Sequence, residues 1–439
     1  MSRQLHFNLF IHSRGHHEAS WRHPDAAVQS VFDVAYYQEL ARTAEAGLFD
    51  SIFFADQLAL GDDIANGPRT GLEPLTTLAA LAVSTTRIGL ISTASTTYTE
   101  PFNLARQFAS LDHISRGRIG WNIVTSWLAT SAQNYGGVLL DHATRYERGE
   151  EFMQVVNGLW DSWASDALID DRTSGRYADI SRIRPINHNG EYYKVGGPLN
   201  LPRCPQGRPV LVQAGSSETG REFAARHAEA VFTAQLEKRT AVEFYADLKH
   251  RATAIGRDVD QGLILPGLSP LIADTETEAQ RLADELGELA DPEVGRKRMS
   301  ARFGGYDFSD LPLDRPLTPD DFPDPETVQA ARSRTDVIVN LVRREKPTLR
   351  QLLAMLAGAR GHHTFAGTPE QVADFMQEWL DDRAADGFNV MPPVLPSMLQ
   401  IFIDEVVPIL QKRGLFRTEY TGTTLRDHYG LSMPLSQYD

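Results

Sequence analysis

Four apolar segments in the first third of the chain each end in a polar or ring-bearing residue. These residues are His12, Asp56, Thr93 and Asn122, and each follows a segment with the composition of a buried β-strand. Imidazole, carboxylate, hydroxyl and amide groups form hydrogen bonds, so together they can bind and orient a polar ligand. Polar functional groups that recur at the carboxyl ends of strands are typical of a TIM-barrel enzyme, whose active site is built from the loops after the strands.

A second candidate site is the segment QAGSSETGREF. A strand end is followed by Gly215, which lets a ligand approach the backbone, and then by Ser216 and Ser217 before a predicted helix. The N–H groups and the dipole at the start of a helix favour phosphate. Taken alone, the pattern fits a generic anion-binding turn and, equally well, a plain serine N-cap.

The histidine-rich stretch HSRGHHEASWRHP raises the question of a metal site, because imidazole is the commonest metal ligand. A barrel metallohydrolase would pair histidines as His-X-His at the end of the first strand, with further ligands on later strands. His12, His16, His17 and His23 lack that spacing. We therefore predict no metal site.

Apolar strand patterns alternate with helical patterns along the chain, which predicts a parallel sheet with helical crossovers. Gly47 is expected to close the first helix as a C-terminal cap. The fold class is therefore α/β, a TIM (β/α)8 barrel. The predicted strands cover residues 5–11, 51–55, 87–93, 117–125, 208–217, 229–235, 262–273 and 387–393, and the predicted helices 32–47, 72–86, 101–115, 145–163, 218–227 and 398–416.

Two interruptions of the βα rhythm predict insertions into a single domain of residues 1–439. The first follows strand four, covers about 160–205, and is expected to carry small strands of its own. The second lies between strands seven and eight and covers about 290–365. Its middle is rich in glycine, proline and charge, which is typical of a functional lid or a disordered loop.

The amino-acid composition narrows the range of possible binding partners. The chain has 43 basic and 58 acidic residues and a net charge of −15, which argues against nucleic acid or an anionic membrane. The single cysteine, Cys204, excludes an intrachain disulfide and favours a cytoplasmic setting. The N-terminus lacks signal-peptide features, and no stretch approaches the roughly 20 apolar residues of a membrane helix.

Motifs over nearly the whole chain resemble those of one family. They are, in order, GHHEASWRHPDA, FDSIFFADQ, ISTASTTYTEPFNLARQFASLDHISRGRIGWNIVTS, NYG, RYERGEEF, NHNGEYYKVGGPLN, PVLVQAGSSETGREFAARHAEAVF, GGYDFS, GTPEQVADF, DGFNVMPP and VVPILQKRGLFRTEYTGTTLRDHYG. The family is the flavin-dependent monooxygenases related to nitrilotriacetate monooxygenase component A, which include dibenzothiophene sulfone, long-chain alkane, EDTA and pristinamycin-type enzymes. They belong to the bacterial-luciferase-like superfamily.

The resemblance implies a bound flavin mononucleotide (FMN) and assigns residues to it. Ser216 and Ser217 would hold the phosphate with Tyr146, and Asn122 would reach the flavin ring or ribityl chain. The remaining candidates for the ring and its loop are Thr93, Asp56 and His142. Asp56 also fits a cap of the next turn, and Tyr146 also fits a core aromatic residue.

The same resemblance places substrate in the loop after the first strand and under the second insertion. His16 and His17 are the catalytic candidates, as hydrogen-bond donors to substrate or to a flavin–oxygen adduct. His12 and Arg14 are candidate contacts for an acidic substrate, and both equally fit rim residues. The insertion contributes the candidate lid contacts His362, His363 and Phe365.

The activity that follows is that of the oxygenase component of a two-component system. A separate NAD(P)H:flavin reductase would supply reduced FMN, and O2 would form a peroxyflavin that oxidises a small organic substrate. The chain shows no GxGxxG dinucleotide fingerprint, so the electrons must come from elsewhere. The alternatives are hydride transfer with the deazaflavin F420, a metal-dependent hydrolase, and a non-catalytic flavin-binding protein. Relatives commonly form homodimers or larger homo-oligomers, and the substrate stays open.

Overall fold

A closed barrel of parallel strands forms the centre of the molecule. The computed structural model describes residues 3–68, 70–324, 332–359 and 361–436. Within these ranges eight strands follow one another around the barrel, and the last pairs with the first. This confirms the predicted TIM barrel, and each predicted strand segment overlaps one of its strands. In barrel order they are β1 (His6–Ile11), β2 (Ser51–Phe54), β3 (Gly89–Ser95), β4 (Ile119–Val124), β9 (Val210–Gln213), β10 (Ala230–Thr233), β11 (Leu263–Ile272) and β13 (Gly387–Val390).

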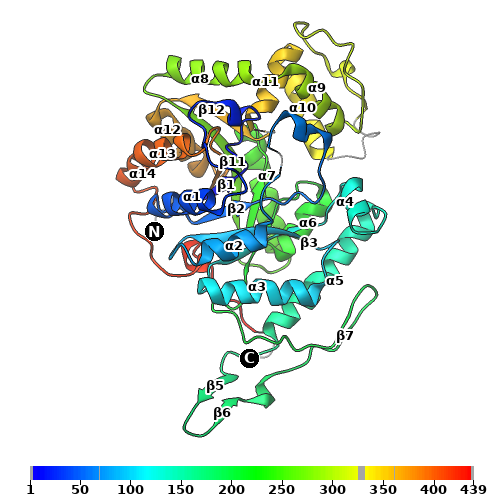
Figure 1. Ribbon diagram of the computed structural model, residues 1–439, viewed down its shortest axis with the longest axis vertical. Coiled ribbons are helices and arrows are strands. Elements are labelled where there is room, and N and C mark those ends of the chain that lie inside the picture. Colours follow the sequence, from blue (N-terminus) through cyan, green and yellow to red (C-terminus); the bar gives the residue numbers. More distant parts are fainter. Residues whose placement is uncertain (1–2, 69, 325–331, 360, 437–439) are drawn as a thin grey trace.

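Helices cover the outside of this barrel (Figure 1). Outward-facing strand residues such as Phe7 and Trp121 are fully buried in the main hydrophobic core with residues of the helices. Inward-facing residues, among them Phe53, Ile91 and Phe232, make a separate core inside the barrel. The covering helices are α1 (Val34–Ala46), α2 (Pro74–Ala82), α3 (Pro101–Ser115), α5 (His142–Asp161), α6 (Glu218–His227), α7 (Lys238–Ala254), α12 (Pro369–Asp381), and the pair α13 (Ser397–Ile401) and α14 (Val407–Lys412), joined by a π-helical turn over Phe402–Val406.

Gly47 ends α1, but not by the left-handed cap that the sequence predicts. Its φ is −78°, and the left-handed residue is Leu48, with φ of 61°. A Cβ atom at Gly47 would lie 2.6 Å from Cγ1 of Ile403. The position therefore requires glycine because of close packing against the closing helix, and that contact cannot be seen in the local sequence.

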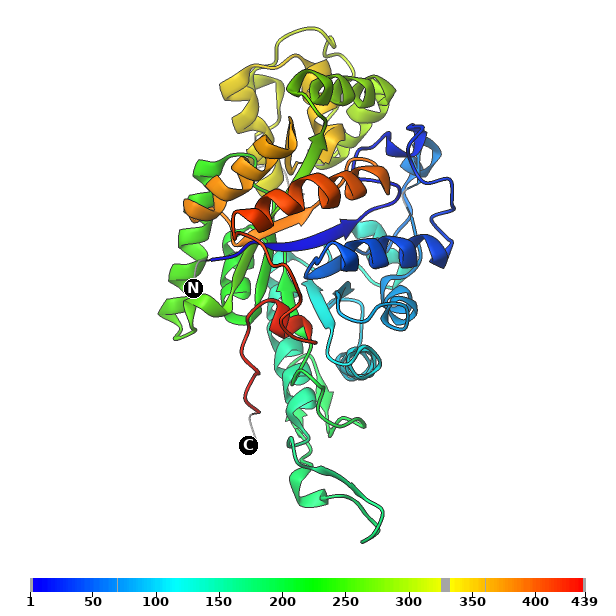
Figure 2. The same ribbon diagram turned by 90° about the vertical axis from the view of Figure 1, so that its left-hand side faces the viewer.

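The first insertion carries small strands, as expected. The hairpin of β5 (Leu168–Asp171) and β6 (Arg176–Ala178) projects away from the barrel (Figures 1 and 2), and β7 (His188–Asn189) pairs with β8 (Lys194–Val195). A short helix, α4 (Ala129–Asn134), precedes α5 in the loop after β4.

The second insertion contains helices as well as a mostly irregular stretch, residues 303–324, which holds much of the glycine- and proline-rich sequence expected to form a loop. It contains α9 (Pro292–Arg302), α10 (Arg332–Glu345) and α11 (Leu349–Ala359), and α8 (Glu276–Leu289) directly precedes it; residues 325–331 and 360 lie outside the described ranges. Apolar residues of this segment form a hydrophobic core of their own. The additional strand β12 (His363–Gly367) then pairs with the end of β11 beyond the barrel (Figure 2).

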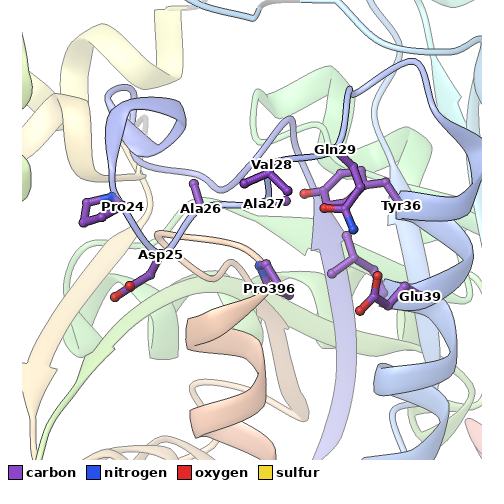
Figure 3. A pocket seen from close by; sticks show the side chains of 10 residues that line it. Pro24, Asp25, Ala26, Ala27, Val28, Gln29, Tyr36, Glu39 and Pro396 are labelled. Carbon is purple, nitrogen blue, oxygen red and sulfur yellow. The ribbon is translucent and has the colours of Figure 1, made fainter.

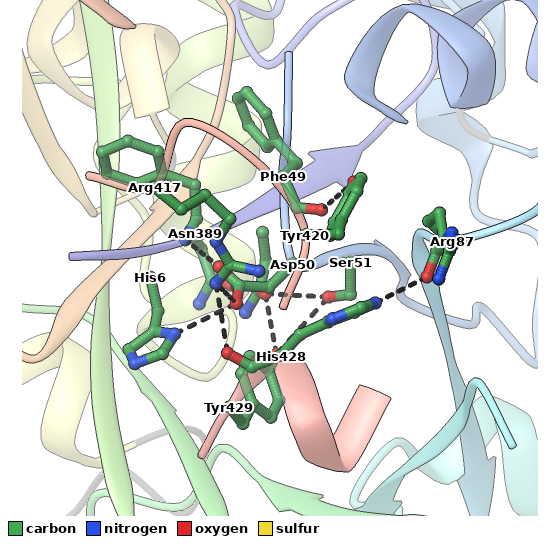
Figure 4. A network of polar contacts seen from close by, with 12 residues as sticks. His6, Phe49, Asp50, Ser51, Arg87, Asn389, Arg417, Tyr420, His428 and Tyr429 are labelled. Carbon is green, nitrogen blue, oxygen red and sulfur yellow. Dashed lines mark hydrogen bonds and ion pairs between the residues drawn. The ribbon is translucent and has the colours of Figure 1, made fainter. Parts of the chain in front are cut away.

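The amino-terminal end of the barrel is closed by a buried polar network (Figure 4). The fully buried Asp50 carboxylate accepts a hydrogen bond from the Phe7 N–H (2.7 Å), lies 3.0 Å from Nδ1 of His6, and forms an ion pair with Arg417. Burial opposes ionisation of Asp50, but Arg417 and His6 outweigh it and hold its pKa below the ordinary value. The short helix α15 (Leu425–His428) plugs this end of the barrel.

Replacing Asp50 by Asn tests how far the fold depends on this network. The variant keeps the side-chain shape but leaves the buried Arg417 without its carboxylate, so we expect a loss of about 3–5 kcal/mol in the free energy of unfolding. Urea denaturation followed by circular dichroism measures it. The matched control is Asp314→Asn, which breaks an exposed ion pair with Arg350 and should change stability little. Equal effects in both variants would contradict the assigned role of Asp50.

Candidate active site

Thr93 and Asn122 are brought together at the carboxyl-terminal mouth of the barrel. They are directly opposite in the register of β3 and β4. Nδ2 of Asn122 donates to Oγ1 of Thr93 (2.8 Å), which donates to the carbonyl oxygen of Phe54 (2.9 Å). Oδ1 of Asn122 is buried and has no hydrogen-bond partner among the described residues. Since buried acceptors are nearly always satisfied, this oxygen is suited to accept from a ligand.

The loop after β1 is fixed at the same mouth by backbone hydrogen bonds. The N–H groups of His16 and His17 donate to the carbonyl oxygens of Pro392 (2.9 Å) and Pro393 (3.2 Å), in the segment after β13. Gly15 has φ of 133°, and a Cβ there would lie 2.2 Å from the Pro393 oxygen, so only glycine allows this contact. The strand-one loop is therefore held in one position.

The two catalytic candidates in this loop are both buried but differ in surroundings. The His16 ring lies 4.5 Å from the Phe10 ring and 5.6 Å from the His12 ring, and its Nε2 is 2.9 Å from the Phe10 carbonyl oxygen. Nδ1 of His17 accepts a hydrogen bond from the Ala19 N–H (3.2 Å). Burial, assisted by the nearby His23, lowers the pKa of His17 to about 4. His17 is therefore neutral at physiological pH.

Asp56 follows β2 at the rim and is half-buried. Its Oδ1 accepts a hydrogen bond from the Gln57 N–H (2.8 Å), which is the local cap that the sequence also allows. Burial raises the pKa of Asp56 to about 6, the hydrogen bond from Gln57 opposes this, and Glu73 adds to it. A carboxyl group that titrates this close to neutrality at a barrel mouth is typical of functional sites.

The phosphate candidates lie on two helices that pack together. Ser217 is the N-cap of α6, and its Oγ accepts from the Gly220 N–H (3.1 Å), so the plain N-cap of the sequence analysis is present. The Tyr146 ring of α5 meets the Phe223 ring of α6 edge to face at 5.8 Å, and the His142 ring lies 4.9 Å from Tyr146. His142 and Tyr146 thus lie on α5, which packs against α6, the helix that begins after Ser216 and Ser217.

The Arg14 side chain lies beside a surface pocket and not among the flavin candidates. Its guanidinium donates to the Gln29 carbonyl oxygen (2.8 Å) beside a surface pocket of about 230 Å³ (Figure 3). The pocket is enclosed by the loop of residues 24–29, helix α1 and Pro396. The flavin candidates do not line it.

The insertion residues separate into two groups because side chains alternate along β12. His363 stacks on Phe375 (4.8 Å between ring centroids) and Phe365 lies 5.1 Å from the same ring, so both face α12. His362 points the other way: a Cβ at Gly267 of β11 would lie 2.3 Å from its Nδ1. His362 lies against Gly267 of β11, while Nδ1 of His363 lies 2.8 Å from the Leu236 carbonyl oxygen in the loop after β10.

Sequence reasoning missed a buried arginine in this region. Arg145, in the first turn of α5, is buried, and its Nη1 donates to the Ser126 carbonyl oxygen (3.2 Å) after β4. In the charged motif RYERGEEF, Arg145 looks like an ordinary exposed residue of a helix. The sequence therefore gave no indication that this arginine is buried. Among the described residues there is no cluster of three histidine, cysteine, aspartate or glutamate residues with metal-site geometry.

These features define a TIM-barrel enzyme whose polar side chains gather at the carboxyl ends of the strands. Residues 13–386 match the family model for luciferase-like monooxygenases. The chain belongs to the luciferase-like monooxygenase family, and it is an oxidoreductase of the group that the sequence motifs indicated. Flavin use is typical of this family. Within the described ranges no helix is long and apolar enough to cross a membrane.

Named relatives match the chain over almost its whole length. N-acetyl-S-(2-succino)cysteine monooxygenase of Bacillus subtilis strain 168 is 49% identical, over 99% of this chain and 98% of its own. Nitrilotriacetate monooxygenase component A of Aminobacter aminovorans is 45% identical, over 99% and 98%. The crystal structure of a riboflavin lyase with modified FMN and the substrate riboflavin has a TM-score of 0.86 at 33% identity, over 98% and 97%.

The depressed pKa of His17 makes a prediction about stability at low pH. In the unfolded chain the imidazole titrates near its ordinary value of 6.5, so between about pH 6.5 and 4 the unfolded state binds more protons than the folded state. The contribution of His17 to the free energy of unfolding is therefore fully present above pH 6.5. It is lost as the pH falls through this window, by up to about 3 kcal/mol.

The substitution His17→Asn, which keeps an acceptor near the Ala19 N–H, should flatten this decline. Urea unfolding between pH 7.5 and about 4 measures the effect, with the exposed His250→Asn as the matched control. A wild-type decline that persists unchanged in His17→Asn would assign the acid sensitivity to other groups.

Proposed function

We propose that this protein is the oxygenase component of a two-component FMN-dependent monooxygenase that acts on a small organic substrate. The observation that carries the proposal is the buried, unsatisfied Oδ1 of Asn122 beside Thr93 at the barrel mouth of a luciferase-like chain. A separate NAD(P)H:flavin reductase supplies reduced FMN, directly or by diffusion. Reduced FMN, when bound, supplies the electrons with which O2 is activated, and the protein supplies binding, orientation and shielding.

The residues present fit FMN. A flavin ring carries N–H and carbonyl groups along one edge, and the Asn122 oxygen is an acceptor without a partner among the described residues. Ser216 and Ser217 lie at the start of a ten-residue helix, where N–H groups and the helix dipole favour the phosphate, and Tyr146 lies on the helix packed against it. Asp56, in the loop after β2, and His142, the first residue of α5, complete the proposed cofactor site.

The loop after β1 contacts the helical insertion, and the proposed role of the two together is to keep water out of the mouth. The Glu18 N–H donates to the Ala357 carbonyl oxygen (2.9 Å) of α11, and the Glu18 carboxylate forms an ion pair with Arg298 of α9. The Arg22 guanidinium donates to the Leu289 carbonyl oxygen at the end of α8. A cover of this kind suits flavin-dependent oxygenation, because activated oxygen is wasted when water reaches the site.

The histidines of the strand-one loop are the proposed catalytic residues. His16 lies between Phe10 and His12 in the mouth, and it is placed to hydrogen-bond substrate or the reacting oxygen. The low pKa of His17 makes it neutral, so its proposed role is to position this loop and to hydrogen-bond without transferring charge. His12 is the proposed substrate contact on the same rim.

An anaerobic titration with reduced FMN, in parallel with reduced F420, tests the proposal. We expect tight binding of reduced FMN, and a transient flavin spectrum distinct from oxidised FMN when the complex is mixed rapidly with oxygen. Binding of F420 alone would favour hydride transfer. Binding of FMN without a transient spectrum, and without substrate-dependent oxygen incorporation, would favour a non-catalytic flavin-binding protein.

The substitution Ser217→Asp tests the phosphate position. Aspartate caps a helix about as well as serine, so α6 should form normally, while the added carboxylate repels the phosphate. We expect the dissociation constant for FMN to rise by about tenfold or more, and that for riboflavin, which has no phosphate, to stay the same. Flavin fluorescence titration measures both. An unchanged FMN affinity, or an equal loss for riboflavin, would refute the assignment.

The substitution Asn122→Leu tests the acceptor in the mouth. Thr93 still donates to the Phe54 carbonyl oxygen, so no donor is left unsatisfied and the melting temperature should change little. We expect flavin affinity to fall by about tenfold, for FMN and riboflavin alike, because the lost hydrogen bond is to the ring or ribityl chain. Wild-type affinity and turnover in this variant would contradict the assigned contact.

A further inference from the structure

The hairpin of β5 and β6 belongs to an arm that stands clear of the barrel (Figures 1 and 2). We define the projecting arm as residues 163–184, which lie between the motifs RYERGEEF and NHNGEYYKVGGPLN. All four residues of β5 are exposed, and so are the first two residues of β6. Among the described residues the two strands pair only with each other, so both outer edges of the hairpin are open.

The root of the projecting arm is fixed to the molecule. Nε1 of Trp163 donates to the Leu199 carbonyl oxygen (2.8 Å). The Asp179 N–H donates to the Ala167 carbonyl oxygen (2.8 Å), so the two sides of the arm are paired up to the start of the hairpin. The arm is therefore held in a set direction, away from the barrel.

The exposed end of the projecting arm carries large apolar side chains. Tyr177 is 67% exposed and Ile180 is 79% exposed, and Leu168 and Ile169 of β5 are exposed as well. Successive residues of a strand point to opposite faces, so Leu168 and Ile169 place apolar surface on both faces of the hairpin. An isolated two-stranded hairpin is only marginally stable in water. Apolar side chains gathered on such a hairpin indicate that it packs against another protein surface.

The charges of the projecting arm favour a second copy of this chain as the other surface. The whole chain has a net charge of −15, so two copies repel each other in general. The arm, in contrast, has no net charge, because it contains four acidic and four basic residues. They are Asp166, Asp170, Asp171, Asp179, Arg172, Arg176, Arg182 and Arg184. Two arms can therefore meet without net repulsion.

The open edges of the hairpin are also self-complementary. Two antiparallel strands present the same alternation of N–H and C=O groups to each other, so one edge can pair with the same edge of a second copy. Such pairing about a two-fold axis is the commonest way in which identical chains associate. Open strand edges are prone to it, and the second copy then covers the apolar residues that the first copy exposes.

We infer that the projecting arm joins two copies of this chain, arm against arm about a two-fold axis. The contact buries Leu168, Ile169, Tyr177 and Ile180 of both copies. It lies far from the proposed active site, because the arm follows the carboxyl end of α5 and Tyr146 lies near the amino end. A helix of 20 residues is about 30 Å long. The inference does not depend on the proposed cofactor.

The mass of the particle in solution tests this contact. Tyr177→Asp combined with Ile180→Asp places carboxylates at two exposed positions, so the fold should be retained while the apolar contact is lost. We expect sedimentation equilibrium to give wild-type protein a mass of two chains or a multiple of it, and the double variant half of the wild-type mass. The matched control is Ile255→Asp, at an exposed isoleucine after α7, which should keep the wild-type mass.

A second variant removes the hairpin outright. Residues 168–178 are replaced by Gly-Gly, and because Ala167 and Asp179 already face each other across a backbone hydrogen bond, a two-residue turn can join them. We again expect half of the wild-type mass, with a cooperative melting transition as the check of folding. Wild-type protein with the mass of one chain, or folded arm variants that keep the wild-type mass, would overturn the inference.

A cross-link identifies what the arm contacts. Cys204 is the single cysteine of the chain and is buried, so a thiol introduced on the arm reacts without competition from an exposed cysteine. Tyr177→Cys treated with a bis-maleimide should give a two-chain product on a denaturing gel, and Ile255→Cys should not. A larger particle that gives no two-chain product from Tyr177→Cys would place the contact elsewhere and overturn the arm-to-arm assignment. A product with an added, purified flavin reductase in place of the two-chain product would assign the arm to that partner.

Discussion

Closure of the parallel strand ladder is the constraint on which the rest of this structure depends. Because β1 pairs with β13 and β10 pairs with β11, every strand of the barrel has neighbours on both sides and all the strands run in one direction. All their carboxyl ends therefore meet at one rim. Residues as distant in sequence as His16, Asn122 and Ser217 come to one end of the molecule for this reason, and not because their local sequences attract one another.

The buried polar groups at the two ends of the barrel differ in how fully they are hydrogen-bonded. At the amino-terminal end the Asp50 carboxylate is matched by a backbone N–H, an imidazole and the guanidinium of Arg417, and the Tyr429 hydroxyl donates to the Asn8 side chain (2.7 Å). At the carboxyl-terminal end the Asn122 oxygen and the Arg145 Nε are left without partners in the described chain. Hydrogen bonds and ion pairs stabilise the closed end, where only single atoms such as Nη1 of Arg417 and Nδ1 of His428 lack a hydrogen-bond partner in the described chain. The unsatisfied groups at the open end keep hydrogen-bonding capacity for ligands.

The second insertion packs against the strand-one loop. Its apolar residues form their own core, and it is attached to the strand-one loop through Glu18, Arg22 and the carbonyl oxygen of Ala357. That loop is itself hydrogen-bonded to the segment after β13. The catalytic candidates His16 and His17 thus lie between two parts of the chain that hold them in place, which suits the precise positioning that oxygenation requires.

The sequence by itself determined the number and position of the barrel strands, because strand formation follows from short apolar runs bounded by turn residues. It also placed Thr93 and Asn122 at the mouth, since alternation along a strand is a local property, and its motifs identified the family. Three features were decided only by tertiary structure. Gly47 is required by its contact with Ile403, His362 lies against Gly267 because β12 joins the end of β11, and Arg145 is buried beside the loop after β4. Each depends on which distant segments meet in space, and a one-dimensional pattern carries no information about the partner on the other side of a contact.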